Sequence, residues 1–133
     1  GAVLVILRSE GYSLMWPNHL GTRPYENGFG DQVVRIDWLP GSVFSPPTNW
    51  FHQHFNTGSE PALQLALRCG SQKFPLGIRV AAIRAGVYSS VRQGGTLIEY
   101  EDEDPAIRTT YEHELARKGI SLDMNYETAA NDD

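Results

Sequence analysis

The chain has 133 residues, of which 41% are hydrophobic and 20% charged, and this length suits one globular domain with one core. Its formal net charge is -5 at pH 7, and no Lys/Arg cluster is interleaved with aromatic residues, so we do not expect nucleic acid as a partner. The single cysteine, Cys69, excludes an internal disulfide and a cysteine-rich zinc site. We expect it to be a buried structural thiol in a cytoplasmic protein.

The first segment, GAVLVIL, is apolar but far shorter than the roughly 20 residues that cross a bilayer, so it predicts a buried strand and no membrane contact. Val3 to Arg8 and the following SEGYSLMW predict two strands around Gly11, because both are rich in β-branched, aromatic and aliphatic residues. The first strand starts at once, without a cap, a turn or a polar lead-in. We therefore expect the chain to be a processed product or a fragment.

Short extended segments follow as far as residue 69. Residues 17–31, PNHLGTRPYENGFGD, are rich in Pro, Gly and Asn and predict a long irregular connection. The alternating QVVRIDWLPG predicts a strand that ends in a turn, VFSPP is expected to continue extended, and FHQHFN and ALQLALR predict further strands. In the last of them one face should hold Leu63, Leu65 and Leu67. Strands separated by Gly/Pro turns at intervals of about 8 to 12 residues are typical of an antiparallel sandwich or barrel, so residues 1–69 are predicted to be all-β.

Residues 70–133 are predicted to be an irregular extension with a helix over about 105–118. Before the helix, periodicity is weak, and we expect loop with a short strand or helical turn near Ile78 to Ala85. Asp104 suits the N-cap of the helix, where such a residue contributes about 1 kcal/mol, and Gly119 suits its end. The apolar stripe recurs at four-residue spacing at Ile107, Tyr111 and Leu115.

Two histidines and an asparagine occupy alternate positions in WFHQHFN. Because side chains two apart on a strand point the same way, His52, His54 and Asn56 are expected to share one face. Two imidazoles on one face can both approach a metal ion, or one can bind the ion while the other contacts a substrate; catalytic metal sites usually have at least three protein ligands. The alternative is a half-polar strand whose histidines hydrogen-bond to neighbouring groups. The pattern by itself leaves both interpretations open.

The residues around the histidines resemble the second motif of the cupin superfamily, G-x5-P-x-G-x2-H-x3-N, and the following TGSEPA is similar to the usual cupin turn. The chain departs from the motif at Asn49, where the family has Gly; Asn tolerates the left-handed backbone conformation better than most residues, so we expect the turn to be kept. A wider similarity, to cupin-domain proteins of undefined activity, extends to about residue 119. The fixed positions that match the motif are Gly41, Pro47, His52 and Asn56.

The resemblance implies a jelly-roll β-barrel, of which this chain forms part, and pairing as a homodimer. It also implies a divalent transition metal (Fe, Mn, Ni or Zn) held by two His and a Glu from a first motif and one His from the second. His52 takes the place of the second-motif ligand. His54 matches no family ligand, but it faces the same side and is expected to contact a small-molecule substrate as the catalytic residue. Asn56 and Trp50 are expected to be further substrate-binding residues.

The first cupin motif, G-x5-H-x-H-x(3 or 4)-E-x6-G, is matched only at its end. RSEGYSLM is similar to its closing segment, with Gly11 as the final Gly, and counting back seven places puts Leu4 at the position of the Glu. The two His would lie before Gly1, so on this register the chain lacks three of the four ligands. Either the H-x-H lies upstream of a truncated product, or the chain is a degenerate half-barrel that binds no metal alone.

Two functional classes follow from these observations. The first is a metal-dependent small-molecule cupin, of the dioxygenase type of oxidoreductase, whose metal site is completed by residues outside this chain. The second is a non-catalytic binding or assembly module with a degenerate metal site. Whether an H-x-H precedes Gly1 is the sequence feature that separates the two.

Overall fold

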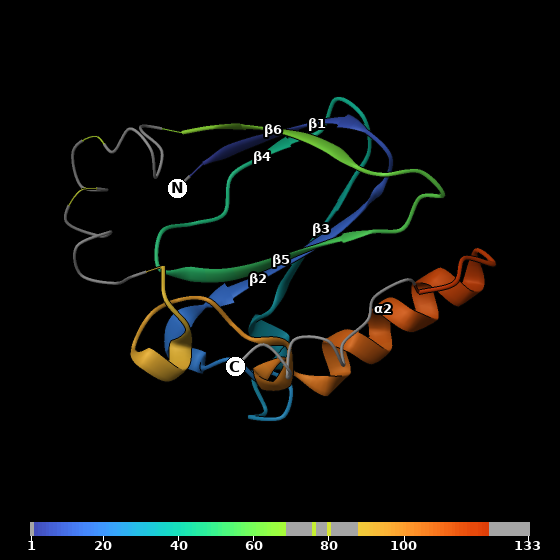
Figure 1. The fold of residues 1–133 in the computed structure, drawn as a ribbon. Helices are drawn as coiled ribbons and strands as arrows, with labels where there is room; N and C mark the ends of the chain where they lie inside the picture. Colours follow the sequence, from blue (N-terminus) through green and yellow to red (C-terminus); the bar gives the residue numbers. More distant parts are fainter. Residues whose placement is uncertain (1, 69–75, 77–79, 81–87, 123–133) are drawn as a thin grey trace, which may run out of the picture.

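The computed structural model describes residues 2–68, 76, 80 and 88–122, and within them the chain forms two three-stranded antiparallel sheets and one α-helix (Figure 1). The two sheets face each other, and the helix lies on the outer side of one of them. The layers are therefore sheet, sheet and helix.

The strands of the first sheet, in spatial order, are β4 (Val43–Phe44), β1 (Val3–Arg8) and β6 (Leu63–Leu67). Those of the second sheet are β3 (Val34–Trp38), β2 (Gly11–Pro17) and β5 (Trp50–Asn56). The 3-10 helices η1 (Asn18–Leu20) and η2 (Gly30–Gln32) lie in the connection from β2 to β3. Two more, η3 (Val91–Gln93) and η4 (Tyr100–Asp102), precede the helix α2 (Pro105–Arg117).

The predicted β-rich architecture with a C-terminal helix is confirmed for the described residues. The segment VFSPP forms only a two-residue strand, since the prolines that follow Phe44 have no backbone N–H to donate to a ladder. Across the described residues the two sheets do not close into a barrel, so the jelly roll stays a prediction. Cys69 lies outside the described residues, as does the segment predicted near Ile78 to Ala85 except for Val80.

The register of β2 against its two neighbours decides which side chains look toward the first sheet. Ser13 lies opposite His54 on β5, and Met15 lies opposite His52. Cross-strand partners point to the same side of a sheet, so these four side chains share a face. Phe44 of β4 meets the His54 ring edge-on, with ring centroids 5.9 Å apart, so this face looks toward the first sheet. The predicted common face of the two histidines is therefore confirmed, and it is the inner one.

A buried apolar cluster lies on the opposite face of the β3-β2-β5 sheet, under α2. Tyr111 of α2 packs on Phe55 of β5 with ring centroids 5.0 Å apart, and its hydroxyl donates to the backbone oxygen of Asn56 at 2.8 Å. The helix therefore covers an apolar sheet face that would otherwise meet water. The buried members of this helix-side core are Tyr12, Leu14, Trp16, Leu20, Phe55 and Ile107.

Both predicted ends of the helix are confirmed. At the N-terminus, Asp104 Oδ1 accepts the backbone N–H of Ala106 at 2.9 Å. At the C-terminus, Gly119 has a φ of 69°, and the N–H of Ile120 reaches back to the carbonyl of Leu115 at 3.0 Å, which is the Schellman arrangement. A glycine suits this position because a side chain strains a backbone with positive φ.

The outer face of the β4-β1-β6 sheet is apolar and exposed. Leu63, Leu65 and Leu67 share it, as predicted, and they are 48%, 47% and 54% exposed. Leu65 pairs with Val5 and Leu67 with Val3 on β1, so the apolar surface continues across the strands. The described part of the chain places no layer over this face, which contrasts with the covered outer face of the other sheet.

Candidate functional site

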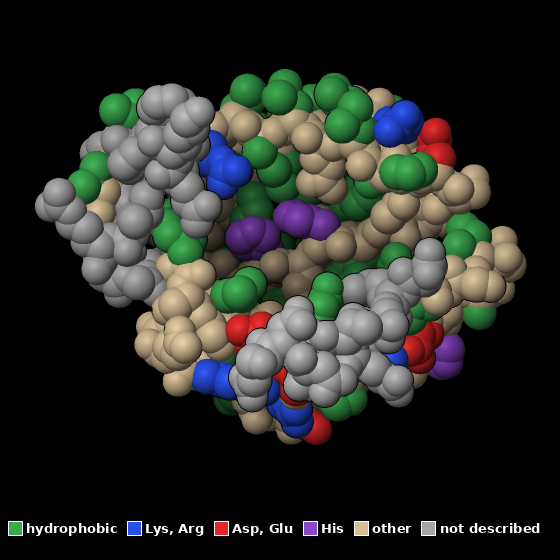
Figure 2. All heavy atoms as spheres, viewed as in Figure 1, with side chains coloured by type: hydrophobic (Ala, Val, Ile, Leu, Met, Phe, Trp, Pro, Cys, Tyr) green, Lys and Arg blue, Asp and Glu red, His purple; other side chains and the backbone are tan. Residues whose placement is uncertain are grey.

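A hollow lies between the two sheets, and Figure 2 shows a pair of histidine side chains at its floor. These are His52 and His54 of β5, whose ring centroids lie 5.4 Å apart. They reach the hollow because the register of β5 against β2 turns every second side chain of the strand inward. The predicted metal ligand and the predicted catalytic residue therefore lie side by side.

The turn that delivers β5 to this position depends on Asn49. Its φ is 63°, which places it in the left-handed region, and its carbonyl accepts the backbone N–H of Asn18 at 3.0 Å. Asn is among the few residues other than Gly that adopt this conformation readily. The departure from the family motif at this position therefore keeps the turn, as expected from the sequence.

The His54 ring is held by a hydrogen-bonded chain of side chains. Its Nδ1 lies 2.7 Å from Ser13 Oγ, and Ser13 Oγ accepts the indole N–H of Trp38 at 3.0 Å. Part of the ring meets solvent through the open hollow, while the groups packed around the rest desolvate it. This desolvation, together with the neighbouring His52, lowers the pKa of His54 to about 4, so the ring is neutral at pH 7.

His52 differs from His54 in its surroundings. Both side chains are exposed, but of the two only His54 bonds to Ser13, and none of the described residues forms a hydrogen bond with the ring nitrogens of His52. A neutral imidazole in this state has a lone pair available for a metal ion or a ligand donor. The two histidines therefore share a face but not a chemical environment.

Asn56 lies on the same face but is engaged in turns. Its Oδ1 accepts the hydroxyl of Ser9 at 2.8 Å and the backbone N–H of Gly58 at 3.2 Å, and its Nδ2 donates to the carbonyl of Glu60 at 2.7 Å. These bonds join the turn after β5 to the turn before β2. The contacts give Asn56 an organising role, and its predicted contact with substrate stays a prediction.

Trp50 is half-buried at the start of β5, opposite Pro17 and two residues from His52 on the same strand face. It is therefore placed to wall the hollow at one end. Ser13 and Trp38 were missed as site residues by the sequence reasoning. The available signal was a serine in the otherwise apolar stretch GYSLMW, two residues after a glycine.

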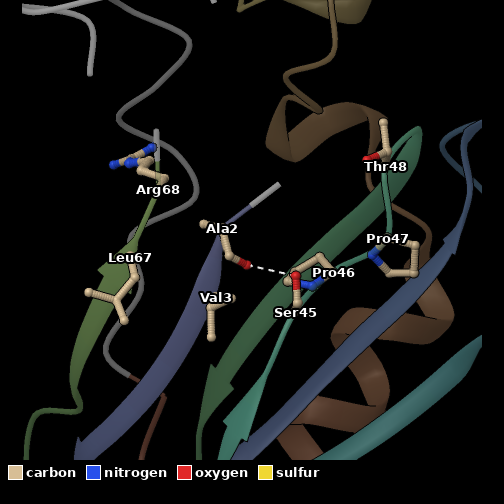
Figure 3. A pocket seen from close by; sticks show the side chains of 8 residues that line it. All are labelled: Ala2, Val3, Ser45, Pro46, Pro47, Thr48, Leu67 and Arg68. Atoms are coloured by element: carbon tan, nitrogen blue, oxygen red, sulfur yellow. Dashed lines mark hydrogen bonds between the residues drawn. The ribbon is translucent and has the colours of Figure 1, made fainter. Parts of the chain in front are cut away.

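One cavity that the described residues line lies elsewhere. It measures about 550 Å³, and Figure 3 shows it between the end of β6, the start of β1 and the segment after β4. A second cavity, of about 250 Å³, lies on the helix side next to Glu10 and Lys118. Neither is lined by His52, His54, Asn56 or Trp50. We place the candidate site in the histidine hollow because the reactive side chains converge there, whereas an opening alone carries no chemistry.

The fit of the implied metal can be tested on the ligands present. Across the described residues, no group of three or more His, Cys, Asp or Glu side chains is placed to hold an ion. Leu4, which the first motif aligns with a Glu ligand, is buried and pairs with Phe44, the residue that meets His54. On this register an apolar side chain of the β4-β1-β6 sheet thus stands where the first cupin motif has a carboxylate. The described residues offer one free imidazole and do not complete a metal centre.

Comparison with known proteins finds no matching family model, no matching curated protein and no matching solved structure. The likeness to the cupin superfamily therefore rests on the sequence motifs alone. Among the described residues, no helix has the length and apolarity needed to cross a membrane.

Proposed function

We propose that the hollow between the two sheets binds a small molecule that contacts His54 and His52. The observation that carries the proposal is the convergence of two imidazoles on one inner strand face, with His54 tied to Ser13 at 2.7 Å. A half-polar strand without a binding role would need neither two histidines facing the hollow nor a buried hydrogen-bond partner for His54. Small-molecule sites combine apolar walls with a few oriented polar groups, and Phe44 and Leu4 supply apolar wall beside the rings.

A second candidate is the metal-dependent oxidoreductase of dioxygenase type that the cupin-like motif implies. The specific observation in its favour is the ring of His52, which has no hydrogen-bond partner among the described residues. His52 would hold a divalent transition ion in company with ligands from outside this chain, within a jelly-roll barrel completed in the same way. When bound, such an ion polarises oxygen atoms of its ligands. Because the described ligands do not complete the centre, no reaction step is derived through it.

Small-molecule binding is tested by NMR with the whole 133-residue chain and a set of small aromatic carboxylates, phenols and amides. We expect compounds that bind to shift the backbone amide signals of His52, His54 and Ser13. His54→Ala should weaken their affinity about fivefold, which corresponds to the loss of one hydrogen bond of about 1 kcal/mol. His113→Ala, on the exposed side of α2, is the matched control and should leave the affinity unchanged. Binding that shifts only residues around the 550 Å³ cavity would move the ligand site there.

Metal binding by the isolated chain is expected to be weak. With only one free imidazole as a protein ligand, most ligands of a bound ion would be water molecules. Isothermal titration calorimetry with Zn²⁺ or Co²⁺ at micromolar protein concentration should therefore show no stoichiometric complex. Tight binding that is lost in His52→Ala and kept in His113→Ala would contradict this, because it would mean that this chain alone completes the centre. The same control variant, His113→Ala, thus serves both tests.

A further inference from the structure

The buried hydroxyl of Ser13 links two side chains that come from different strands. Ser13 is fully buried on β2, with Trp38 of β3 on one side and His54 of β5 on the other. Trp38 Nε1 lies 3.0 Å from Ser13 Oγ, and Ser13 Oγ lies 2.7 Å from His54 Nδ1. No other hydrogen-bond partner of this hydroxyl occurs among the described residues.

The direction of each hydrogen bond follows from which group is able to donate. The indole N–H is only a donor, so Ser13 Oγ accepts from Trp38. The hydroxyl hydrogen then needs an acceptor, and the described neighbour that offers one is His54 Nδ1. If Nδ1 carried a hydrogen instead, Ser13 Oγ would face two donors and its own hydrogen would be buried without a partner, which is unfavourable. A neutral imidazole with an unprotonated Nδ1 carries its hydrogen on Nε2.

We propose that Ser13 and Trp38 are positioning residues that hold His54 in the tautomer with its hydrogen on Nε2, so that His54 offers an N–H to an acceptor oxygen of the bound small molecule. The ligand class that matches this donor is a compound bearing a carboxylate or carbonyl oxygen. This tautomer withholds the Nε2 lone pair from a metal ion. His54 is thereby assigned to ligand recognition, while His52, whose ring is free of such contacts, is left as the residue able to bind an ion. The ligand half of the proposal rests on the proposed function; the tautomer half does not.

Gly11 makes this arrangement sterically possible. It lies directly opposite Trp38, and a Cβ placed on Gly11 would come within 2.7 Å of the Trp38 ring. The indole therefore packs closely against β2 at Gly11 and reaches Ser13, two residues further along the strand. Trp38 packs against Gly11 and donates a hydrogen bond to Ser13, which gives a physical reason for a small residue at each of the two positions.

The tautomer is tested directly by two-bond hydrogen–nitrogen NMR of the 15N-labelled 133-residue chain, at a pH where the imidazoles are neutral. We expect His54 Nδ1 to resonate as an unprotonated nitrogen and Nε2 as a protonated one. Ser13→Ala removes the donor and should give a mixture of tautomers, while Ser45→Ala, which removes an exposed hydroxyl bonded only to the Ala2 backbone, should leave His54 unchanged. Trp38→Phe frees Ser13 Oγ to accept, so it should raise the fraction with the hydrogen on Nδ1.

A protonated Nδ1 on His54 in the unmodified protein would overturn the positioning role, and this measurement does not depend on any variant folding. The ligand class is tested with benzoate and benzylamine as probes on the same sample. We expect benzoate, and not benzylamine, to shift the His54 Nε2–H signal, and we expect its affinity to fall severalfold in Ser13→Ala but not in Ser45→Ala. If benzoate binds in the hollow without moving that signal, the ligand assignment is wrong. If the tautomer is as expected and no compound binds at all, the proposed function fails while the positioning role stands.

Discussion

Replacing Asp104 by alanine is expected to lower the free energy of unfolding by about 3 to 5 kcal/mol, well above the cost of an ordinary N-cap. The carboxylate is fully buried and accepts three backbone N–H groups. One is that of Ala106 in α2 at 2.9 Å, and the others are those of Tyr25 and Glu26 in the β2–β3 connection, at 2.7 and 3.1 Å. Alanine would leave these three part-buried donors without their shared acceptor and would release the helix from the connection. Stabilities of small domains are typically about 5 to 15 kcal/mol, so the loss would be a large part of the total.

The measurement is chemical denaturation followed by tryptophan fluorescence and circular dichroism. Asp37→Ala is the matched control, because the Asp37 side chain is 73% exposed and its ion pair with Arg35 lies at the surface, where such pairs contribute about 0 to 1 kcal/mol. Asp104→Asn should fall between the two, since it keeps an acceptor oxygen but turns an NH₂ group toward a donor. Equal losses in Asp104→Ala and Asp37→Ala would show that Asp104 does not join the helix to the loop.

Replacing Ile107 by alanine is expected to cost about 2 to 5 kcal/mol, the range for a large-to-small change in a packed core. Ile107 is 1% exposed and belongs to the helix-side core with Tyr12 and Trp16. The comparison that makes the test sharp is Leu65→Ala on the outer face of the β4-β1-β6 sheet. Leu65 is 47% exposed, so its change should stay within about 0.5 kcal/mol.

Denaturation midpoints of the two variants decide where the apolar energy of the fold resides. If Ile107→Ala lowers the free energy of unfolding much more than Leu65→Ala does, the stabilising apolar contacts lie mainly between the β3-β2-β5 sheet and α2. The reverse order would mean that the outer face of the β4-β1-β6 sheet is covered in solution and that the helix adds little.

Features that depend on neighbours along the chain could be predicted from the amino-acid sequence. β3 and β5 appear where side-chain character alternates, because alternation matches the pleat of a strand, and β1 and β2 appear where β-branched, aromatic and aliphatic residues are concentrated. The helix starts at Asp104 and ends at Gly119 because capping is a local exchange of hydrogen bonds. The left-handed turn at Asn49 was implied by the resemblance to the cupin motif and is compatible with the conformational range of Asn, and the common face of His52 and His54 followed from their spacing.

Which sheet faces meet, and which groups pair across long separations in sequence, could be seen only in the folded chain. The alternation in β5 shows that His52 and His54 lie on one face of the strand and Phe55 on the other, but it does not show which face α2 covers. In the structure Ile107 and Tyr111 pack on the face of Phe55, so the histidines are left in the hollow. The sequence predicts for Asp104 only the contribution of an N-cap, about 1 kcal/mol. Its further hydrogen bond from the N–H of Tyr25 could not be foreseen, because Tyr25 is 79 residues away.

The bond between Ser13 and His54 likewise spans 41 residues and exists because β2 pairs with both β3 and β5 in one register. Local patterns report the backbone conformation that a segment prefers, since that preference is set within a few residues. Trp38 and His54 are brought together because apolar faces that are distant in sequence are buried against each other. The residue pattern within one segment does not show which distant segment it will pack against.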